Sequence, residues 1–429
     1  MDRLLVTGGA RLAGTVRVSG AKNAALKHMA AALLAPGRSV VRNVPRILDC
    51  TLMGRVLEHL GVPVAWDGDA VSIDATVLGS TEAPYELVKQ MRASIVVLGP
   101  LVARAGRAQV ALPGGDEIGS RPIDLHLQGL AKLGAEIRTE HGFVIAEAPH
   151  GLRGAIIILD YPSVGATENL MMAAVAARGT TVIDNAAREP EIADTAAFLR
   201  AMGARIEGAG TSTIQVEGVD GFVPAEHTTI ADRIESGTWA AAAVATRGDV
   251  VLDGARADHL DLLLSKLADA GATVQLVVDG IRVVQDDRPR AIDFVTLPYP
   301  GLATDFQPIL MAMLAVAQGT SIATENVFES RFLYVDELRR MGADIRTEGH
   351  HAVIRGVERL SAAPVRAVDI RAGAAMTIAA LCADGVSEIA DVHHLDRGYE
   401  SLEAKLTSLG AEVRREGDAV VVPDPAETV

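Results

Sequence analysis

Leu133-Gly134-Ala135-Glu136-Ile137 is one of six copies of a single pattern, in which a helix-like segment ends at an apolar residue, a glycine follows, and a β-like strand begins. The glycines of the other copies are Gly61, Gly203, Gly271, Gly342 and Gly410. Successive glycines lie roughly 70 residues apart, beyond the period of about 20–50 residues that is typical of solenoid proteins. Each copy therefore predicts a small unit of helix and sheet rather than one turn of a solenoid.

A second series of glycines alternates with the first. Each of its members follows an alanine-rich, helix-like segment and precedes a short β-branched strand: Gly37, Gly106, Gly179, Gly248, Gly319 and Gly385. We interpret these glycines as helix C-caps, because glycine adopts the left-handed backbone conformation without steric cost. The two series together predict an α/β fold of six repeats with two helices each, which divide naturally into three and three.

The alanine-rich segments, such as Ala173 to Ala177 and Ala240 to Ala245, have almost no charged face. A helix that is apolar all round belongs in the interior of a protein. The segments between them, such as Val250-Val251-Leu252, are short and β-branched, as expected for sheet. We therefore expect helices inside and sheets around them, with the irregular stretch from Val223 to His227 as the linker between the two halves.

Composition restricts the classes of function. The chain has 429 residues, 49% of them hydrophobic, and a formal charge of −15 from 40 Lys and Arg against 55 Asp and Glu, which argues against a general nucleic-acid or anionic-membrane surface. Its apolar stretches are too short and too interrupted to span a bilayer. Cys50 and Cys382 each stand alone, so neither a disulfide framework nor a thiolate metal site is indicated. We expect a cytoplasmic protein without an export signal or a membrane anchor.

Two segments stand out for their composition. Lys22 lies near the predicted N-terminus of a helix, where its charge adds to the partial positive charge of the backbone amides and favours an anion; a solvated lysine is the alternative. The stretch from Leu112 to Leu125 holds three glycines and two prolines around Asp116-Glu117. Such a loop is typical of a lid, and its alternative is a surface turn, in which Asp is common.

Arginines beside turn residues recur along the chain: Arg92, Arg188, Arg331, Arg371 and Arg397. Guanidinium groups bind phosphates and carboxylates at two points, whereas a single such arginine more often forms a surface ion pair. Arg188, Arg331 and Arg397 occupy corresponding loops of their repeats, which favours a shared basic cleft. The pairs His350-His351 and His393-His394 lack zinc-like spacing, so we predict no metal site.

Several distinctive blocks follow one another from near Leu4 almost to the C-terminus. They are Ser19-Gly20-Ala21-Lys22-Asn23-Ala24, Met91-Arg92-Ala93-Ser94-Ile95, the loop from Pro113 to Leu125, Ser163-Val164-Gly165-Ala166-Thr167, Asn185-Ala186-Ala187-Arg188-Glu189-Pro190-Glu191, Asp232-Arg233-Ile234-Glu235, Thr304-Asp305 and Asp396-Arg397-Gly398-Tyr399-Glu400. In these blocks the chain resembles the UDP-N-acetylglucosamine enolpyruvyl transferases, which begin the synthesis of peptidoglycan precursors.

The resemblance implies an inside-out α/β barrel of two domains, each with three βαβ-type repeats. The first domain would comprise residues 22–229 and carry a mobile loop at 112–122, and the second would comprise residues 1–21 with 230–429. The implied reaction transfers the enolpyruvyl group of phosphoenolpyruvate to the 3-hydroxyl of UDP-N-acetylglucosamine, without a metal or other cofactor. These two small molecules are the partners that it implies. The sequence leaves the oligomeric state open.

The resemblance also implies roles for particular residues. Asp116 would be the general acid, Asp305 would polarise the attacking hydroxyl, and Lys22 and Arg397 would complete the catalytic set. Phosphoenolpyruvate would be bound by Lys22, Asn23, Arg121, Arg331, Arg371 and Arg397. UDP-N-acetylglucosamine would lie along Arg92, Arg121, Pro122, Ile123, Asp124, Leu125, Tyr161, Ser163, Val164, Asp305 and Val327.

Three positions depart from the family. Many relatives carry a cysteine where this chain has Asp116, an aromatic residue in place of Val96, and a lysine in place of Tyr161. The last two leave the uridine contacts open. The first predicts resistance to fosfomycin, which in this family alkylates the loop cysteine. Two alternatives remain: a related transferase that acts on shikimate 3-phosphate or a specialised metabolite, and a nonenzymatic UDP-sugar sensor.

Overall fold

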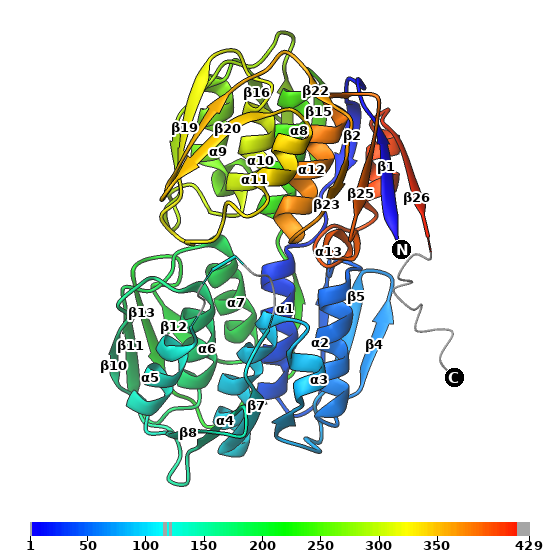
Figure 1. Cartoon of the computed structure of the whole chain (residues 1–429). Helices are drawn as coiled ribbons and strands as arrows, with labels where there is room; N and C mark the ends of the chain where they lie inside the picture. Colours follow the sequence, from blue (N-terminus) through cyan, green and yellow to red (C-terminus); the bar gives the residue numbers. More distant parts are fainter. Residues whose placement is uncertain (1, 115–117, 120–121, 418–429) are drawn as a thin grey trace. The chain divides into compact units, whose positions relative to one another are not determined.

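The computed structural model describes residues 2–114, 118–119 and 122–417. Within them the chain forms two compact units, one of residues 20–114 and 122–230 and the other of residues 2–19, 118–119 and 231–417. They are called the 20–230 unit and the 231–417 unit below. Each has its own hydrophobic core. Figure 1 shows both units as helices surrounded by strands.

The 20–230 unit contains three four-stranded sheets, each built by one repeat. The first repeat consists of α1 (Lys22–Ala31), η1 (Ala32–Leu34), β3 (Arg38–Arg42), α2 (Leu48–His59), β4 (Val64–Asp67), β5 (Ala70–Asp74) and β14 (Glu226–Thr228). The second consists of β6 (Glu82–Ala83), α3 (Tyr85–Val88), η2 (Arg92–Val97), α4 (Leu98–Ala105), β7 (Arg107–Ala111), α5 (Asp124–Lys132), β8 (Glu136–Glu140) and β9 (Phe143–Glu147). The third consists of β10 (Ile156–Ile158), α6 (Val164–Ala174), β11 (Thr180–Asp184), α7 (Pro190–Ala201), β12 (Arg205–Glu207) and β13 (Thr213–Glu217).

The 231–417 unit repeats this plan three times. Its first repeat consists of β2 (Ala13–Arg17), α8 (Arg233–Ala245), β15 (Asp249–Asp253), η3 (Ala257–His259), α9 (Asp261–Asp269), β16 (Thr273–Val277) and β17 (Gly280–Val284). The second consists of β18 (Phe294–Val295), α10 (Phe306–Leu314), β19 (Thr320–Thr324), α11 (Val335–Arg340), β20 (Asp344–Glu348) and β21 (His351–Arg355). The third consists of β22 (Leu360–Ser361), β23 (Pro364–Arg366), α12 (Ile370–Leu381), β24 (Ala383–Asp384), β25 (Val386–Ala390), α13 (His393–Asp396), α14 (Leu402–Ser408), β26 (Glu412–Glu416) and β1 (Arg3–Thr7).

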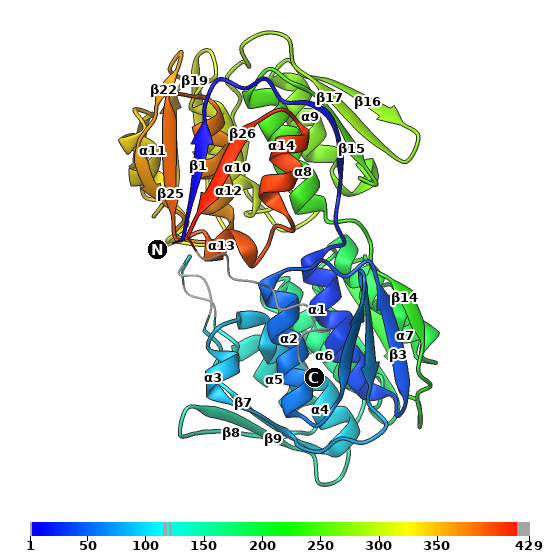
Figure 2. The same cartoon turned by 90° about the vertical axis from the view of Figure 1, so that its right-hand side faces the viewer.

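The six four-stranded sheets share one strand order: two parallel strands lie side by side, and two more strands continue the sheet in antiparallel pairing. In the sheet β10-β11-β13-β12, Ile156 lies opposite Val182 and Thr180 lies opposite Glu217. In four of these sheets the two parallel strands are joined through an inner helix, whereas β2 continues through α1 to β3 and β14 continues through α8 to β15. Three of these sheets each contain one strand that is far in sequence from the other strands of the sheet. β2 pairs with β15, β14 pairs with β3, and β1 lies between β25 and β26 (Figure 2). The expected six-repeat, inside-out α/β architecture is confirmed.

The inner helices form the interior of each unit. In the 231–417 unit every residue of α8, α10 and α12 is buried, and α10 packs against the other two. In the 20–230 unit nine of the ten residues of α1 and nine of the eleven residues of α6 are buried. By contrast α2, α5, α9 and α14 bury only part of their surface. Small side chains allow the inner helices to pack closely, and their uniformly apolar surface explains why sheets can surround them.

The first glycine series behaves as predicted. Its six glycines directly follow the C-cap residues of α2, α5, α7, α9, α11 and α14, with φ between 79° and 106°. The second series needs a correction. All six of its glycines are among the described residues, and Gly106 is the only helix C-cap in this series. Gly248 is not left-handed, because Arg247 takes the positive φ; a Cβ on Gly248 would lie 2.3 Å from the carbonyl oxygen of Leu12.

The expected linker from Val223 to His227 was also wrong in part. Glu226–Thr228 forms β14, which pairs in parallel with β3, and Glu226 lies opposite Val40. The chain passes from one unit to the other after β14, between residues 230 and 231. An irregular local composition therefore conceals a strand whose partner lies nearly two hundred residues away in the sequence.

Candidate active site

Asp305 and Arg371 form the centre of a charged cluster in the 231–417 unit. Asp305 immediately precedes α10, and its Oδ1 accepts a hydrogen bond of 2.8 Å from Nε of Arg371. Arg371 is buried in the first turn of α12, whose N-cap residue Asp369 accepts hydrogen bonds from the backbone N–H groups of Arg371 and Ala372. The guanidinium of Arg371 also lies 5.5 Å from the ring centroid of Tyr399. These contacts hold Arg371 in one orientation against the carboxylate.

The surroundings of Asp305 keep its carboxyl group ionised. Burial alone would raise the pKa of Asp305, but the positive charges of Arg371 and Arg331 outweigh burial and hold the pKa well below its ordinary value. A carboxylate that is anionic at neutral pH accepts hydrogen bonds and donates none. Asp305 can therefore orient and polarise a hydroxyl group presented to it.

Arg331 is a buried cation with unused hydrogen-bonding capacity. It lies between β19 and α11 and is only 4% exposed. Its Nε and Nη2 have no hydrogen-bond partner among the described residues. Buried polar groups in folded proteins are nearly always paired, and each such exception calls for an explanation. A phosphate or carboxylate bound at two points would supply the missing acceptors.

Glu325 shapes the loop that leads to Arg331, and sequence reasoning missed this residue. Oε1 of its buried side chain accepts hydrogen bonds from the backbone N–H groups of Val327 (2.8 Å) and Phe328 (3.1 Å). Its Oε2 accepts a hydrogen bond of 3.0 Å from the hydroxyl of Thr304, next to Asp305. Glu325 thus links the predicted site residue Val327 to the chain segment that carries Asp305. The only signal in the sequence was a glutamate placed directly after a strand with β-branched residues.

Lys22 lies in a second cluster of charged side chains, which belongs to the 20–230 unit. It is the first residue of α1, and its Nζ lies 2.7 Å from Oδ2 of Asp49 on α2. Both side chains are buried, so the alternative of a solvated lysine is wrong. Asn23 follows Lys22 and is partly buried, and Arg92 begins η2 and is also partly buried. Together with the backbone amides at the start of α1, this cluster is suited to an anion.

A buried polar network behind α1 was not predicted from sequence. Nζ of Lys27 lies 3.2 Å from Oε2 of Glu168 on α6, and burial raises the pKa of Glu168 to about 7 although the charge of Lys27 opposes this. Nδ1 of His126 accepts a hydrogen bond of 2.9 Å from the side-chain amide Nδ2 of Asn169. Lys27 and Glu168 are 141 positions apart and His126 and Asn169 are 43 apart, so no local spacing indicates that either pair meets.

The remaining predicted residues are more varied in their surroundings. Among the positions expected along the nucleotide sugar, Ser163 is the N-cap of α6 and accepts a hydrogen bond of 3.3 Å from the N–H of Ala166, while Tyr161 is exposed. Pro122 and Asp124 are exposed, and Ile123, Leu125, Val164 and Arg397 are partly buried. Arg188 is exposed. Asp116 and Arg121 lie outside the described residues.

Comparisons with a family model, with curated sequences and with solved structures all identify similar enolpyruvyl or carboxyvinyl transferases. The family model for EPSP synthase (3-phosphoshikimate 1-carboxyvinyltransferase) matches residues 6–406. The UDP-N-acetylglucosamine 1-carboxyvinyltransferases of Corynebacterium jeikeium and Nocardia farcinica are both 55% identical, covering 96% and 97% of this chain and 99% of each relative. The crystal structure of the enolpyruvyl transferase NikO from Streptomyces tendae is similar with a TM-score of 0.87 at 28% identity, covering 96% of this chain and 98% of that one.

Proposed function

The chain belongs to the EPSP synthase (3-phosphoshikimate 1-carboxyvinyltransferase) family, and from this premise we propose that it transfers the enolpyruvyl group of phosphoenolpyruvate to the 3-hydroxyl of UDP-N-acetylglucosamine. Phosphate is released, and the reaction is the first committed step of peptidoglycan precursor synthesis, and so serves cell-wall biogenesis. Two relatives that are 55% identical over nearly their full length are named for this activity. Their names support UDP-N-acetylglucosamine, rather than shikimate 3-phosphate, as the acceptor.

The strongest structural support for this proposal is the burial of Arg331, two of whose nitrogens lack hydrogen-bond acceptors within the described part of the chain. Its unpartnered Nε and Nη2 face no acceptor among the described residues, while its charge acts on Asp305. Phosphoenolpyruvate offers both a carboxylate and a phosphate, and an arginine fork matches either group at two points. Lys22, Asn23, Arg92, Arg121, Arg371 and Arg397 are proposed to complete the binding of the two anionic substrates.

The proposed chemistry is addition followed by elimination. In the addition, the sugar 3-hydroxyl gives its proton to Asp305 as its oxygen forms a bond to C2 of phosphoenolpyruvate, and Asp116 gives a proton to C3, so that the C2=C3 double bond becomes single. In the elimination, C3 returns a proton to the carboxylate of Asp116, the C2=C3 double bond forms again, and the C2–O bond to phosphate breaks, which releases phosphate. Fixed positive charges that meet the phosphate and carboxylate in both steps lower the barrier through electrostatic preorganisation.

Location and partners form a second part of the proposal. Among the described residues, no helix has both the length and the apolar character needed to cross a membrane. We place the enzyme in the cytoplasm, because UDP-sugars and phosphoenolpyruvate are anions that do not cross a bilayer unaided. The two substrates are the binding partners that we propose, and we propose no binding to nucleic acid or to a membrane.

Phosphate release from phosphoenolpyruvate in the presence of UDP-N-acetylglucosamine tests the proposal, with shikimate 3-phosphate as the alternative acceptor. We expect product with the UDP-sugar and none with shikimate 3-phosphate. Asp305→Asn should lower kcat by about 10²–10⁴-fold, the contribution typical of proton-transfer groups. Asp336→Asn removes a carboxylate that is 76% exposed in the same unit and should leave kcat unchanged. Turnover of shikimate 3-phosphate at a comparable rate would refute the proposed acceptor.

A further inference from the structure

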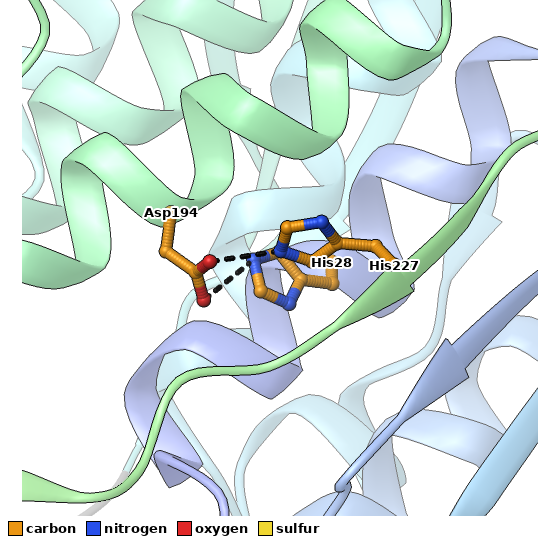
Figure 3. A group of neighbouring side chains, drawn as sticks. All are labelled: His28, Asp194 and His227. Atoms are coloured by element: carbon orange, nitrogen blue, oxygen red, sulfur yellow. Dashed lines mark hydrogen bonds and ion pairs between the residues drawn. The ribbon is translucent and has the colours of Figure 1, made fainter.

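Three potential metal ligands meet in the 20–230 unit, and none of them is assigned to the reaction. His28 comes from α1, Asp194 from α7 and His227 from β14 (Figure 3). One ligand atom from each residue can be chosen so that all three lie within 4.8 Å of one another. Figure 3 shows both imidazole rings facing the carboxylate of Asp194.

The distances are close to those of a coordination shell. Nε2 of His28 lies 3.5 Å from Oδ2 of Asp194, and Nε2 of His227 lies 2.8 Å from Oδ1. Ligands that surround Zn²⁺ tetrahedrally at about 2.0–2.1 Å are separated by about 3.3–3.4 Å. The pair formed by His28 and Asp194 therefore already has the required spacing. His227 would need a small rotation, with the ion taking the place of the proton that it now shares with Asp194.

Nε2 of His28 is a second, independent indication of a ligand. His28 is completely buried, and this nitrogen has no hydrogen-bond partner among the described residues. Its other ring nitrogen, Nδ1, lies 3.2 Å from the hydroxyl oxygen of Thr229. A neutral imidazole whose Nδ1–H is bound by a neighbouring group presents the Nε2 lone pair, as in metal-bound histidines.

The surroundings favour a bound ion and allow it to enter. Oδ2 of Asp194 accepts a hydrogen bond of 3.1 Å from the backbone N–H of Ile230, which fixes the orientation of the carboxylate. Phe198 packs against both imidazole rings, with centroid distances of 5.5 Å to each. An apolar wall of this kind strengthens coordination bonds by excluding water. The side chain of His227 is 15% exposed, which leaves an approach from solvent.

We propose that His28, Asp194 and His227 bind one divalent transition-metal ion of the zinc or cobalt type, with water completing its coordination. Two imidazoles and one carboxylate suit Zn²⁺, Co²⁺ and Ni²⁺, whereas Mg²⁺ and Ca²⁺ prefer oxygen ligands alone. The site is structural. It joins α1, α7 and β14, three elements that are far apart in sequence, just before the chain leaves the 20–230 unit. The proposal does not depend on the proposed reaction.

Co²⁺ is the probe, because its visible absorption reports the ligand geometry directly. Metal-free full-length protein is titrated with Co²⁺, and bound metal is measured by absorption and by elemental analysis after gel filtration. We expect one equivalent with the intense bands of a four- or five-coordinate site, displaced by Zn²⁺, and a rise in the thermal unfolding temperature. His227→Gln and His28→Leu should each lower the affinity at least about tenfold. Thr229→Val should weaken it by about 10- to 100-fold, as the loss of an outer-shell partner does.

A matched control excludes adventitious binding by surface histidines. His351→Gln alters an exposed residue in the 231–417 unit and should leave stoichiometry, spectrum and affinity unchanged. Circular dichroism in chelator confirms that each variant is folded before titration, and His227→Gln changes a partly exposed strand residue that should tolerate replacement. The proposal is overturned if the wild-type protein binds no Co²⁺, or if His227→Gln and His28→Leu bind it as tightly as the wild type does.

Discussion

Arg331 is a buried cation, and two of its guanidinium nitrogens, Nε and Nη2, have no hydrogen-bond partner among the residues that the structure describes. Each unsatisfied buried group costs on the order of 1–3 kcal/mol of folding free energy, and this cost is recovered when an anion binds. We therefore expect Arg331→Met to leave the thermal unfolding temperature unchanged or higher. The same change should lower kcat/KM for phosphoenolpyruvate at least about tenfold, since a charge-assisted contact is lost.

Arg331→Lys separates charge from geometry in the same experiment. Lysine keeps the positive charge but cannot form the planar two-point contact, so kcat/KM should remain well below that of the wild type. Steady-state kinetics with varied phosphoenolpyruvate, together with scanning calorimetry, gives both quantities. A methionine variant that is less stable yet fully active would contradict the assignment of Arg331 to anion binding.

Asp116 is the proposed proton donor, and the resemblance to the family implies that it stands where many members carry a cysteine. The reference pKa of an aspartic acid is about 3.9, against about 8.5 for a thiol, and a carboxylate is the weaker nucleophile toward an epoxide. We expect the wild-type enzyme to resist fosfomycin. Asp116→Cys should retain measurable turnover and lose activity with time in fosfomycin, whereas Asp116→Asn should lose most turnover and still bind the UDP-sugar. Time-dependent inactivation of the wild type would show that the proton donor is misassigned.

At the scale of single elements, the inner helices depend on glycine where they approach one another. An ideal Cβ on Gly237 of α8 would lie 2.3 Å from Cε1 of Phe306 and 2.6 Å from Cδ2 of Leu263. Both neighbours are buried and cannot move into solvent. Overpacking of this kind costs about 1–3 kcal/mol, so Gly237→Ala should lower the free energy of unfolding by that amount.

Gly54 on α2 is the matched control. The nearest atom to its ideal Cβ is Cγ1 of Val64 at 3.6 Å, which is ordinary van der Waals contact. Alanine is favoured over glycine inside a helix by roughly 0.5–1 kcal/mol, so Gly54→Ala should stabilise the protein. Urea unfolding followed by circular dichroism compares the two variants. Equal effects of the two substitutions would mean that close helix contact does not explain Gly237.

At the scale of the whole molecule, two separate cores carry different titrating groups. The 20–230 unit contains His28 and His126, and burial lowers their pKa values to about 3 and about 4. Below pH 6.5 these two histidines are protonated in the unfolded chain, but in the folded unit they stay unprotonated until the pH approaches their lowered pKa values. Stability is therefore present above about pH 6.5 and is lost as the pH falls toward the folded pKa values. Glu168 in the same unit has a pKa raised to about 7 by burial and therefore opposes this loss between pH 7 and its ordinary pKa, but two histidines outweigh one glutamate. We expect acid unfolding to begin in this unit.

His126→Asn tests this expectation, because asparagine places an oxygen near the position of Nδ1 that meets Asn169. Between pH 7 and pH 5 the wild type should lose about 2 kcal/mol of stability through His126 alone, from about 1.4 kcal/mol per pH unit over the titrating range. The variant should lose correspondingly less. Hydrogen exchange at the two pH values locates the loss, and the exposed His351→Asn serves as the control. Uniform loss of protection in both units would contradict the prediction.

The sequence by itself determined the repeat, the inner helices and the positions of tight backbone turns. These features follow from local physics: glycine is needed where φ is positive after a helix, and a helix without a charged face is stable only inside. The six glycines from Gly61 to Gly410 and the fully buried α8 and α12 were predictable for this reason. The charged site residues were proposed from their resemblance to a family, and their roles stay predictions.

Only the tertiary structure decided which distant residues meet. Arg371 reaches Asp305 across 66 positions, and β14 finds its partner strand 186 positions away. The burial of Arg331 and the meeting of His28, Asp194 and His227 likewise depend on how separate helices and strands pack. Local propensity and periodicity specify which face of an element is apolar, but they do not specify which polar side chain on another element completes a charge pair or a metal shell.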